Sequence, residues 1–152
     1  MEKEKYMSAA LELAREAAEH GEVPVGCVIT DSGGHIIGRG RNRREESGDA
    51  TAHAEIEAIR AACASLGGWR LDGCTMYVTL EPCPMCAGAI INSRISRVVF
   101  AAKDARAGAL GSLINLDRYP FNHHPEIVSG VLGAEAAGLL RDFFGKLREK
   151  RK

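Results

Sequence analysis

Two kinds of hydrophobic spacing divide the N-terminal third of the chain. In residues 3–20 the apolar side chains recur with the period of a helix that packs along one face, and Gly21 is a typical helix end. The segments VPVGCVIT and HIIGRGRN then flank the turn DSGG and are rich in strand-forming residues. The pattern predicts a packing helix followed by a β-hairpin.

The rest of the chain alternates between helical and extended patterns. A helix is predicted from Thr51, a suitable N-cap, to about Leu66, where two glycines end it. TMYVTL is typical of a strand, CAGAIINSR of a helix and SRVVFAA of a buried strand. Residues 102–124 are expected to be irregular with one helical turn, before a strand in EIVSGVL and a helix over 134–149. This order predicts an α/β fold whose mixed sheet carries helices on both faces.

Composition adds a size class and a location. A chain of 152 residues is long enough for one domain, and 45% hydrophobic with 26% charged residues is ordinary for a globular protein. The first twenty residues mix both charge signs, and no apolar run approaches the length of a membrane span. We therefore expect one domain over residues 1–152, in the cytoplasm and without a membrane partner.

Net charge does not decide between partners, because 20 basic and 20 acidic residues cancel. The segments GRGRNRR and RDFFGKLREKRK nevertheless concentrate basic side chains, which could steer a phosphate backbone. Basic residues also protect a sheet edge and suit a helix C-terminus, so both interpretations stay open at this point.

The segment EPCPMC indicates a metal site. Cys83 and Cys86 lie on the first turn of one predicted helix, and His53 lies on the first turn of another. The partial positive charge of a helix N-terminus favours a thiolate over a thiol. Ligands of α/β sheets collect in the crevice where such strand-to-helix connections meet. We therefore expect these three side chains to converge.

The remaining cysteines decide whether the site is closed. Cys63 is about 15 Å from His53 along its helix, far beyond a zinc–sulfur bond of about 2.3 Å. Cys74 precedes a strand whose other end leads to Cys83, a span of roughly 30 Å. Cys27 is excluded as a fourth ligand less firmly than these two, because its strand could pass the site. Its apolar neighbours predict a thiol packed in the core instead. Three ligands with an open fourth position are the pattern of a catalytic zinc site.

Glu55 is the candidate proton carrier, two positions after His53. A solvated helix carboxylate is the alternative, but a zinc site beside it favours general acid–base work. Among the other histidines, His20 and His35 are expected to be exposed. His123 and His124 lie in the irregular segment and could face the crevice.

The order His-x-Glu, about thirty residues, then Pro-Cys-x-x-Cys resembles the zinc nucleobase deaminases. Over nearly the whole chain the sequence is similar to the bacterial tRNA-specific adenosine deaminases, through TAHAEI, YVTLEPCPMCAGAI, DARAGALGSL, FNH and DFFGKLR. One departure is Ala50, where the family often has proline.

The resemblance implies a three-layer α/β/α sandwich of the cytidine-deaminase type with a mixed five-stranded sheet. It also implies a homodimer with one Zn²⁺ per subunit, which hydrolyses adenosine to inosine at the wobble position of an arginine tRNA anticodon stem-loop. By the same resemblance His53, Cys83 and Cys86 bind zinc, Glu55 shuttles protons and Asn42 bonds the purine. Further expected substrate contacts are Arg44, Ala54, Asp104, Arg106, Asn122, His123, Phe144 and Arg148.

Two other functions remain open from the sequence. A deaminase of a free base or nucleoside, such as guanine or cytosine, shares the same metal signature. A non-catalytic zinc-binding module is a rival from another class, and Glu55 and the open fourth position argue against it.

Overall fold

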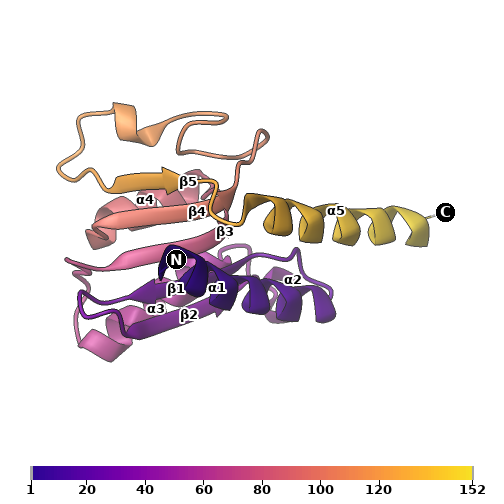
Figure 1. Ribbon diagram of the computed structural model, residues 1–152, viewed down its shortest axis with the longest axis horizontal. Helices are drawn as coiled ribbons and strands as arrows, with labels where there is room; N and C mark the ends of the chain where they lie inside the picture. The colour runs from indigo at the N-terminus through magenta and orange to yellow at the C-terminus, as the bar shows by residue number, and fades with distance from the viewer. Residues whose placement is uncertain (1, 152) are drawn as a thin grey trace.

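The five strands form one mixed sheet in the order β2-β1-β3-β4-β5 (Figure 1). The computed structural model describes residues 2–151. The strands are β1 (Gly26–Thr30), β2 (Ile36–Arg41), β3 (Thr75–Leu80), β4 (Arg97–Ala102) and β5 (Glu126–Ser129). β1 is antiparallel to β2 and β3, whereas β3, β4 and β5 run parallel. The predicted hairpin and the mixed five-stranded sheet are confirmed.

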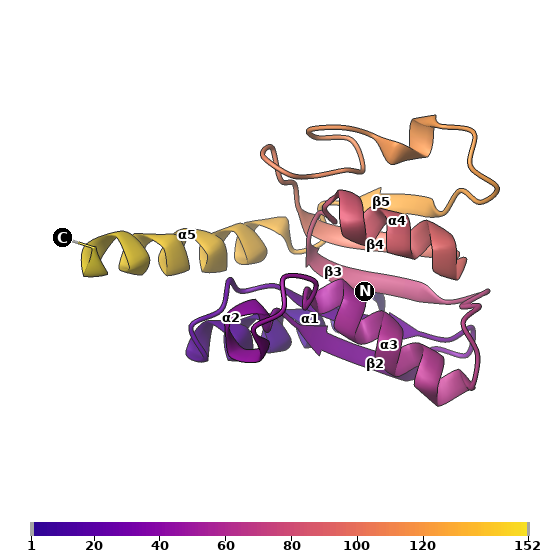
Figure 2. The same cartoon turned by 180° about the vertical axis from the view of Figure 1, so that it is seen from behind.

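Helices cover both faces of the sheet, as predicted. α1 (Glu2–Glu19) and α5 (Gly133–Lys150) lie on one face, and α3 (Ala54–Leu66) and α4 (Pro84–Ser93) lie on the other (Figures 1 and 2). Successive residues of β3 divide between the two cores: Tyr77 packs with α1, while Met76 and Val78 pack with α3 and α4. The α/β/α sandwich is therefore confirmed. None of the helices within residues 2–151 is long and apolar enough to cross a membrane.

Glycines on β2 bring α3 close to the sheet. A Cβ at Gly40 would collide with the carbonyl oxygen of Ala54, and one at Gly38 would collide with that of Ala58. Because both glycines lack a side chain, the first two turns of α3 lie directly on the strand. This contact fixes the start of the helix that carries His53 as its N-cap.

The start of α3 corrects one prediction. Thr51 is not the N-cap: His53 takes that position with extended backbone, and the Thr51 hydroxyl donates to the Asp49 carboxylate instead. Asp49 also accepts the Thr51 backbone N–H, so a local turn takes the side chain that could have capped the helix. The short helix α2 (Arg44–Ser47) was not predicted, whereas the helical turn in the irregular segment is η1 (Leu116–Arg118).

Candidate active site

The three predicted ligands converge where two helices begin. His53 is the N-cap of α3, Cys83 is the N-cap of α4, and Cys86 follows in the first turn of α4. Their ligand atoms all lie within 4.8 Å of one another. His53 Nδ1 is 3.6 Å from the sulfur of Cys83 and 3.6 Å from that of Cys86.

These distances fit a zinc ion. A tetrahedral centre with Zn–S near 2.3 Å and Zn–N near 2.05 Å separates nitrogen from sulfur by about 3.6 Å. A hydrogen bond from Cys86, together with one from His53, lowers the pKa of Cys83 to about 4, while the pKa of His53 is raised by its bond with Cys83. The donor set of one imidazole and two sulfurs is the one that zinc deaminases use.

No fourth protein ligand joins the cluster among residues 2–151. Cys27 is fully buried in the core between the sheet and α3, and burial raises the pKa of its thiol, so the expected core role is confirmed. Cys63 and Cys74 face the backbone carbonyls of Trp69 and Asp72. The site therefore keeps the open coordination position of a catalytic centre.

Glu55 is buried beside this cluster, with 4% of its surface exposed. Burial is the main cause that raises the pKa of its carboxyl group to about 7. A carboxyl group with that pKa both accepts and releases a proton near neutral pH. The alternative of a solvated surface carboxylate is thereby excluded.

A cleft of about 800 Å³ opens over His53, Cys83 and Glu55. One wall is the segment 103–107, which follows β4, and another is the outer half of α5, from Leu140 to Arg151. Six of the expected substrate contacts line this cleft: Asn42, Arg44, Asp104, Arg106, Phe144 and Arg148. Segments far apart in sequence therefore meet above the metal ligands.

The Asn42 side chain is held in one orientation. Its Oδ1 accepts the backbone N–H of Ala54 at 3.0 Å, and its Nδ2 donates to the carbonyl of Val23 at 3.1 Å. Asn42 thus satisfies the first free N–H of α3, and one N–H of its amide remains for a ligand in the cleft. Ala54 itself is fully buried, so only its backbone reaches this network.

Asn122 and His123 lie elsewhere. The His123 Nε2 atom is 2.6 Å from the carbonyl oxygen of Ile95, which precedes β4. The cleft lies at the other end of that strand, beyond Ala102. His124 contacts Asp117 and also lies outside the cleft, while His20 and His35 are exposed as predicted.

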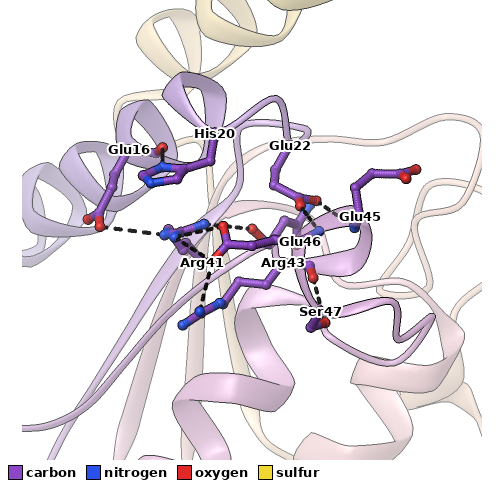
Figure 3. A network of polar contacts seen from close by, with 9 residues as sticks. Glu16, His20, Glu22, Arg41, Arg43, Glu45, Glu46 and Ser47 are labelled. Carbon is purple, nitrogen blue, oxygen red and sulfur yellow. Dashed lines mark hydrogen bonds and ion pairs between the residues drawn. The ribbon is translucent and has the colours of Figure 1, made fainter.

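Arg44, which lines the cleft, is the first residue of α2, and a network of polar contacts holds this short helix in place (Figure 3). The buried Glu22 carboxylate accepts the backbone N–H groups of Glu45 and Glu46. Arg41 contacts the Glu46 carboxylate at 3.0 Å, and Arg43 contacts it at 2.8 Å. Two of the four arginines in GRGRNRR are thus committed to ion pairs that hold α2.

Sequence reasoning missed three charged residues of the cleft lining: Glu81, Lys103 and Arg151. The charge run at the C-terminus was a signal for Arg151, although it did not locate the residue. No sequence pattern indicated Lys103 as a residue of the cleft. Glu81 stands inside the recognised segment YVTLEPCPMC, but its partners follow more than twenty positions later.

Comparison with known proteins places this site in a family. The cytidine and deoxycytidylate deaminase zinc-binding region matches residues 1–102. A tRNA-specific adenosine deaminase of Bacillus subtilis is 51% identical over 150 residues, covering 98% of this chain and 92% of that protein.

Two solved structures are also similar. One comes from work on A-to-I editing by tRNA:A34 deaminases at the wobble position of transfer RNA; it has a TM-score of 0.87 and 45% identity, and covers 90% of this chain and 99% of its own. Guanine deaminase from Nitrosomonas europaea has a TM-score of 0.77 and 28% identity over 93% of this chain and 84% of its own. The chain belongs to the cytidine and deoxycytidylate deaminase family, and within it groups with proteins named tRNA-specific adenosine deaminase.

Proposed function

We propose that residues 1–152 work as a single zinc-dependent deaminase domain that converts adenosine to inosine at the wobble position of a tRNA anticodon, with an arginine tRNA as substrate. One observation carries the proposal: a three-ligand metal site and the buried Glu55 share the floor of one cleft. The 51% identity to a protein named tRNA-specific adenosine deaminase supports the choice of substrate.

Each side chain has a defined task in this reaction. A zinc ion held by His53, Cys83 and Cys86 would supply a water whose pKa is lowered to about 7 and which can add to carbon 6 of the adenine. Glu55 would carry one proton of this water to the ring nitrogen beside carbon 6, and its second proton to the amine, which leaves as ammonia when the bond from carbon 6 to nitrogen breaks. Asn42 uses its remaining N–H to hold the purine.

The charge of the cleft favours RNA over a free base. Basic side chains at its walls are Arg44, Lys103, Arg106, Arg148 and Arg151. These five basic side chains outnumber the three acidic ones of the lining, of which Glu81 and Asp104 accept hydrogen bonds from backbone N–H groups of the loop that follows β4. A free base carries no phosphate and gains nothing from this arrangement.

A homodimer is part of the proposal. Exposed apolar side chains extend from α4 into the segment that follows β4, namely Met85, Leu113, Ile114, Tyr119 and Phe121. We name these five residues the apolar face. Asn122 and His123 follow it directly in sequence, so a partner docked there is the route by which they would contact RNA. None of the five cysteines forms a disulfide bond, which suits the proposed cytoplasmic location.

The test compares substrates directly. Zinc-loaded protein is incubated with an arginine anticodon stem-loop, other anticodon stem-loops, free adenosine and guanine, and inosine and ammonia are measured. Inosine in the arginine stem-loop is expected. Ammonia released only from guanine, or inosine formed only from free adenosine, would contradict the proposal in favour of a free-base deaminase.

A further inference from the structure

The side chain of Glu81 is a buried carboxylate at the edge of the cleft, with 2% of its surface exposed. It stands two positions before Cys83, and no ion pair engages it among the described residues. Its oxygens instead accept hydrogen bonds from one loop, residues 104–112. Oε1 accepts the N–H of Asp104 and the hydroxyl of Ser112, while Oε2 accepts the N–H groups of Leu110 and Ser112.

The loop is shaped around this carboxylate. A Cβ at Gly108 would collide with the Glu81 carboxylate, so only glycine fits there without displacement. The Asp104 side chain accepts the N–H groups of Arg106 and Ala107, and the carbonyl of Pro82 accepts the N–H of Ala109. The loop is therefore fixed to the segment that delivers the metal ligands.

The same loop forms a wall of the cleft through residues 103–107. We propose that Glu81 is a positioning residue: it sets this wall, with Arg106 upon it, at a fixed distance from the metal ligands, so that binding of the RNA substrate depends on it. The identity of the substrate in this inference rests on the proposed function. The anchoring of the loop by Glu81 is independent of that function. Glu81 keeps no free lone pair for a metal ion once its hydrogen bonds are formed.

A carboxylate is required at this position, because every partner is a donor. In Glu81→Gln one oxygen becomes an NH₂ group, which faces either Asp104 N–H or the N–H groups of Leu110 and Ser112. Whichever way the amide turns, at least one backbone N–H of the loop loses its acceptor. The loop is then expected to move away from the motif while the zinc ligands stay in place.

The experiment measures RNA binding and turnover separately in Glu81→Gln. We expect KM for an anticodon stem-loop to rise roughly tenfold or more, which corresponds to one lost charged hydrogen bond, with kcat at saturating RNA and zinc content little changed. The dissociation constant, measured in a Glu55→Ala background where no turnover occurs, should rise by the same factor. The matched control is Asp31→Asn, a carboxylate that accepts the backbone N–H groups of Gly33 and His35 in the β1–β2 turn.

Gly108→Ala perturbs the same contact from the loop side and leaves Glu81 intact. It should also raise KM, and the double variant should show less than the product of the two effects, because both displace one loop. If Glu81→Gln fails to fold, Gly108→Ala takes its place in the measurements of KM and of the dissociation constant.

Three results would overturn the inference: an unchanged KM and dissociation constant, a loss of zinc in Glu81→Gln, or unchanged hydrogen exchange at the amides of Asp104, Leu110 and Ser112. Wild-type protein that deaminates no RNA would instead overturn the proposed function. The exchange measurement would then still decide whether Glu81 anchors the loop.

Discussion

At the level of single residues, Glu55 combines burial with a neighbouring metal site. The low polarity of its surroundings raises the pKa of the carboxyl group, so that a proton can move in both directions near neutral pH. The ligands on either side of it, His53 and Cys83, are held by the N-terminal ends of two different helices. Proton transfer and metal binding therefore depend on different side chains, so a substitution can remove one of these functions and leave the other.

Glu55→Ala should remove turnover and keep the metal. We expect the rate of inosine formation to fall by roughly a hundredfold or more, with a full complement of zinc by metal analysis and an unchanged melting temperature. Glu57→Ala, on the same helix and outside the cleft lining, is the control and should retain activity. Full activity of Glu55→Ala would reject its role as proton carrier.

Cys83→Ala should lose the metal, because two ligands do not hold a zinc ion tightly. Zinc content after dialysis against a weak chelator is the measurement, and no activity assay is needed. Cys63→Ala removes a thiol outside the ligand cluster and should bind zinc normally. A normal zinc content in Cys83→Ala would refute the ligand assignment.

The spacing of residues predicted the chemistry well, because metal ligands and the proton carrier must obey fixed bond lengths. It could not predict Glu81, whose role is visible only when the 104–112 loop lies around its carboxylate. Nor could it place Asn122 and His123: their segment is irregular, and no periodic pattern shows which end of the sheet it covers.

At the level of elements, α2 depends on tertiary contacts. Four residues are too few for a stable helix on their own, and the missing partners are Glu22, from a distant segment, and Arg41, at the end of β2. This is why the sequence did not predict α2. The Thr51 cap was wrong for a related reason, since Asp49 competed for the same hydroxyl. Long helices and strands were predicted because their own periodicity determines them.

The stability that α2 gains from Glu46 should depend on pH. The hydrogen bond from Arg41 holds the pKa of Glu46 below its ordinary value of 4.5, so the carboxylate stabilises the fold above that pH and loses this effect as pH falls through the lowered pKa. The difference in melting temperature between wild type and Glu46→Gln should therefore be largest near neutral pH and vanish as the pH falls through the lowered pKa of Glu46.

Glu45→Gln is the control on the same helix, because its side chain forms no ion pair within residues 2–151. A Glu46→Gln difference that stayed constant across the pH range would show that the ion pairs around Arg41 do not stabilise α2.

At the level of the whole molecule, the sandwich leaves the apolar face uncovered. Leu113 is 55% exposed and Ile114 is 42% exposed, on the segment that packs beside α4. Exposed apolar side chains gathered in one place are typical of a protein–protein contact. The mixed sheet with helices on both faces followed from the sequence pattern, but a surface between two chains leaves no periodic signal within one.

Ile114→Glu should therefore shift the protein from dimer to monomer, measured by analytical ultracentrifugation across a range of concentrations. The introduced charge would have to be buried at the contact, which is unfavourable without a partner. Ser8→Glu, at an exposed position of α1 on the opposite face, should leave the mass unchanged. A wild-type protein that sediments as a monomer at every concentration would reject the homodimer.

The projection of α5 beyond the sheet also has a practical result for handling the protein (Figure 1). Arg151, at the end of that helix, belongs to the cleft wall, whereas no residue of α1 does. A purification tag or fusion partner joined at the carboxyl end thus begins beside the opening through which a bulky nucleic acid must arrive. Joined at the amino end it begins on α1, so engineered versions should carry their additions there.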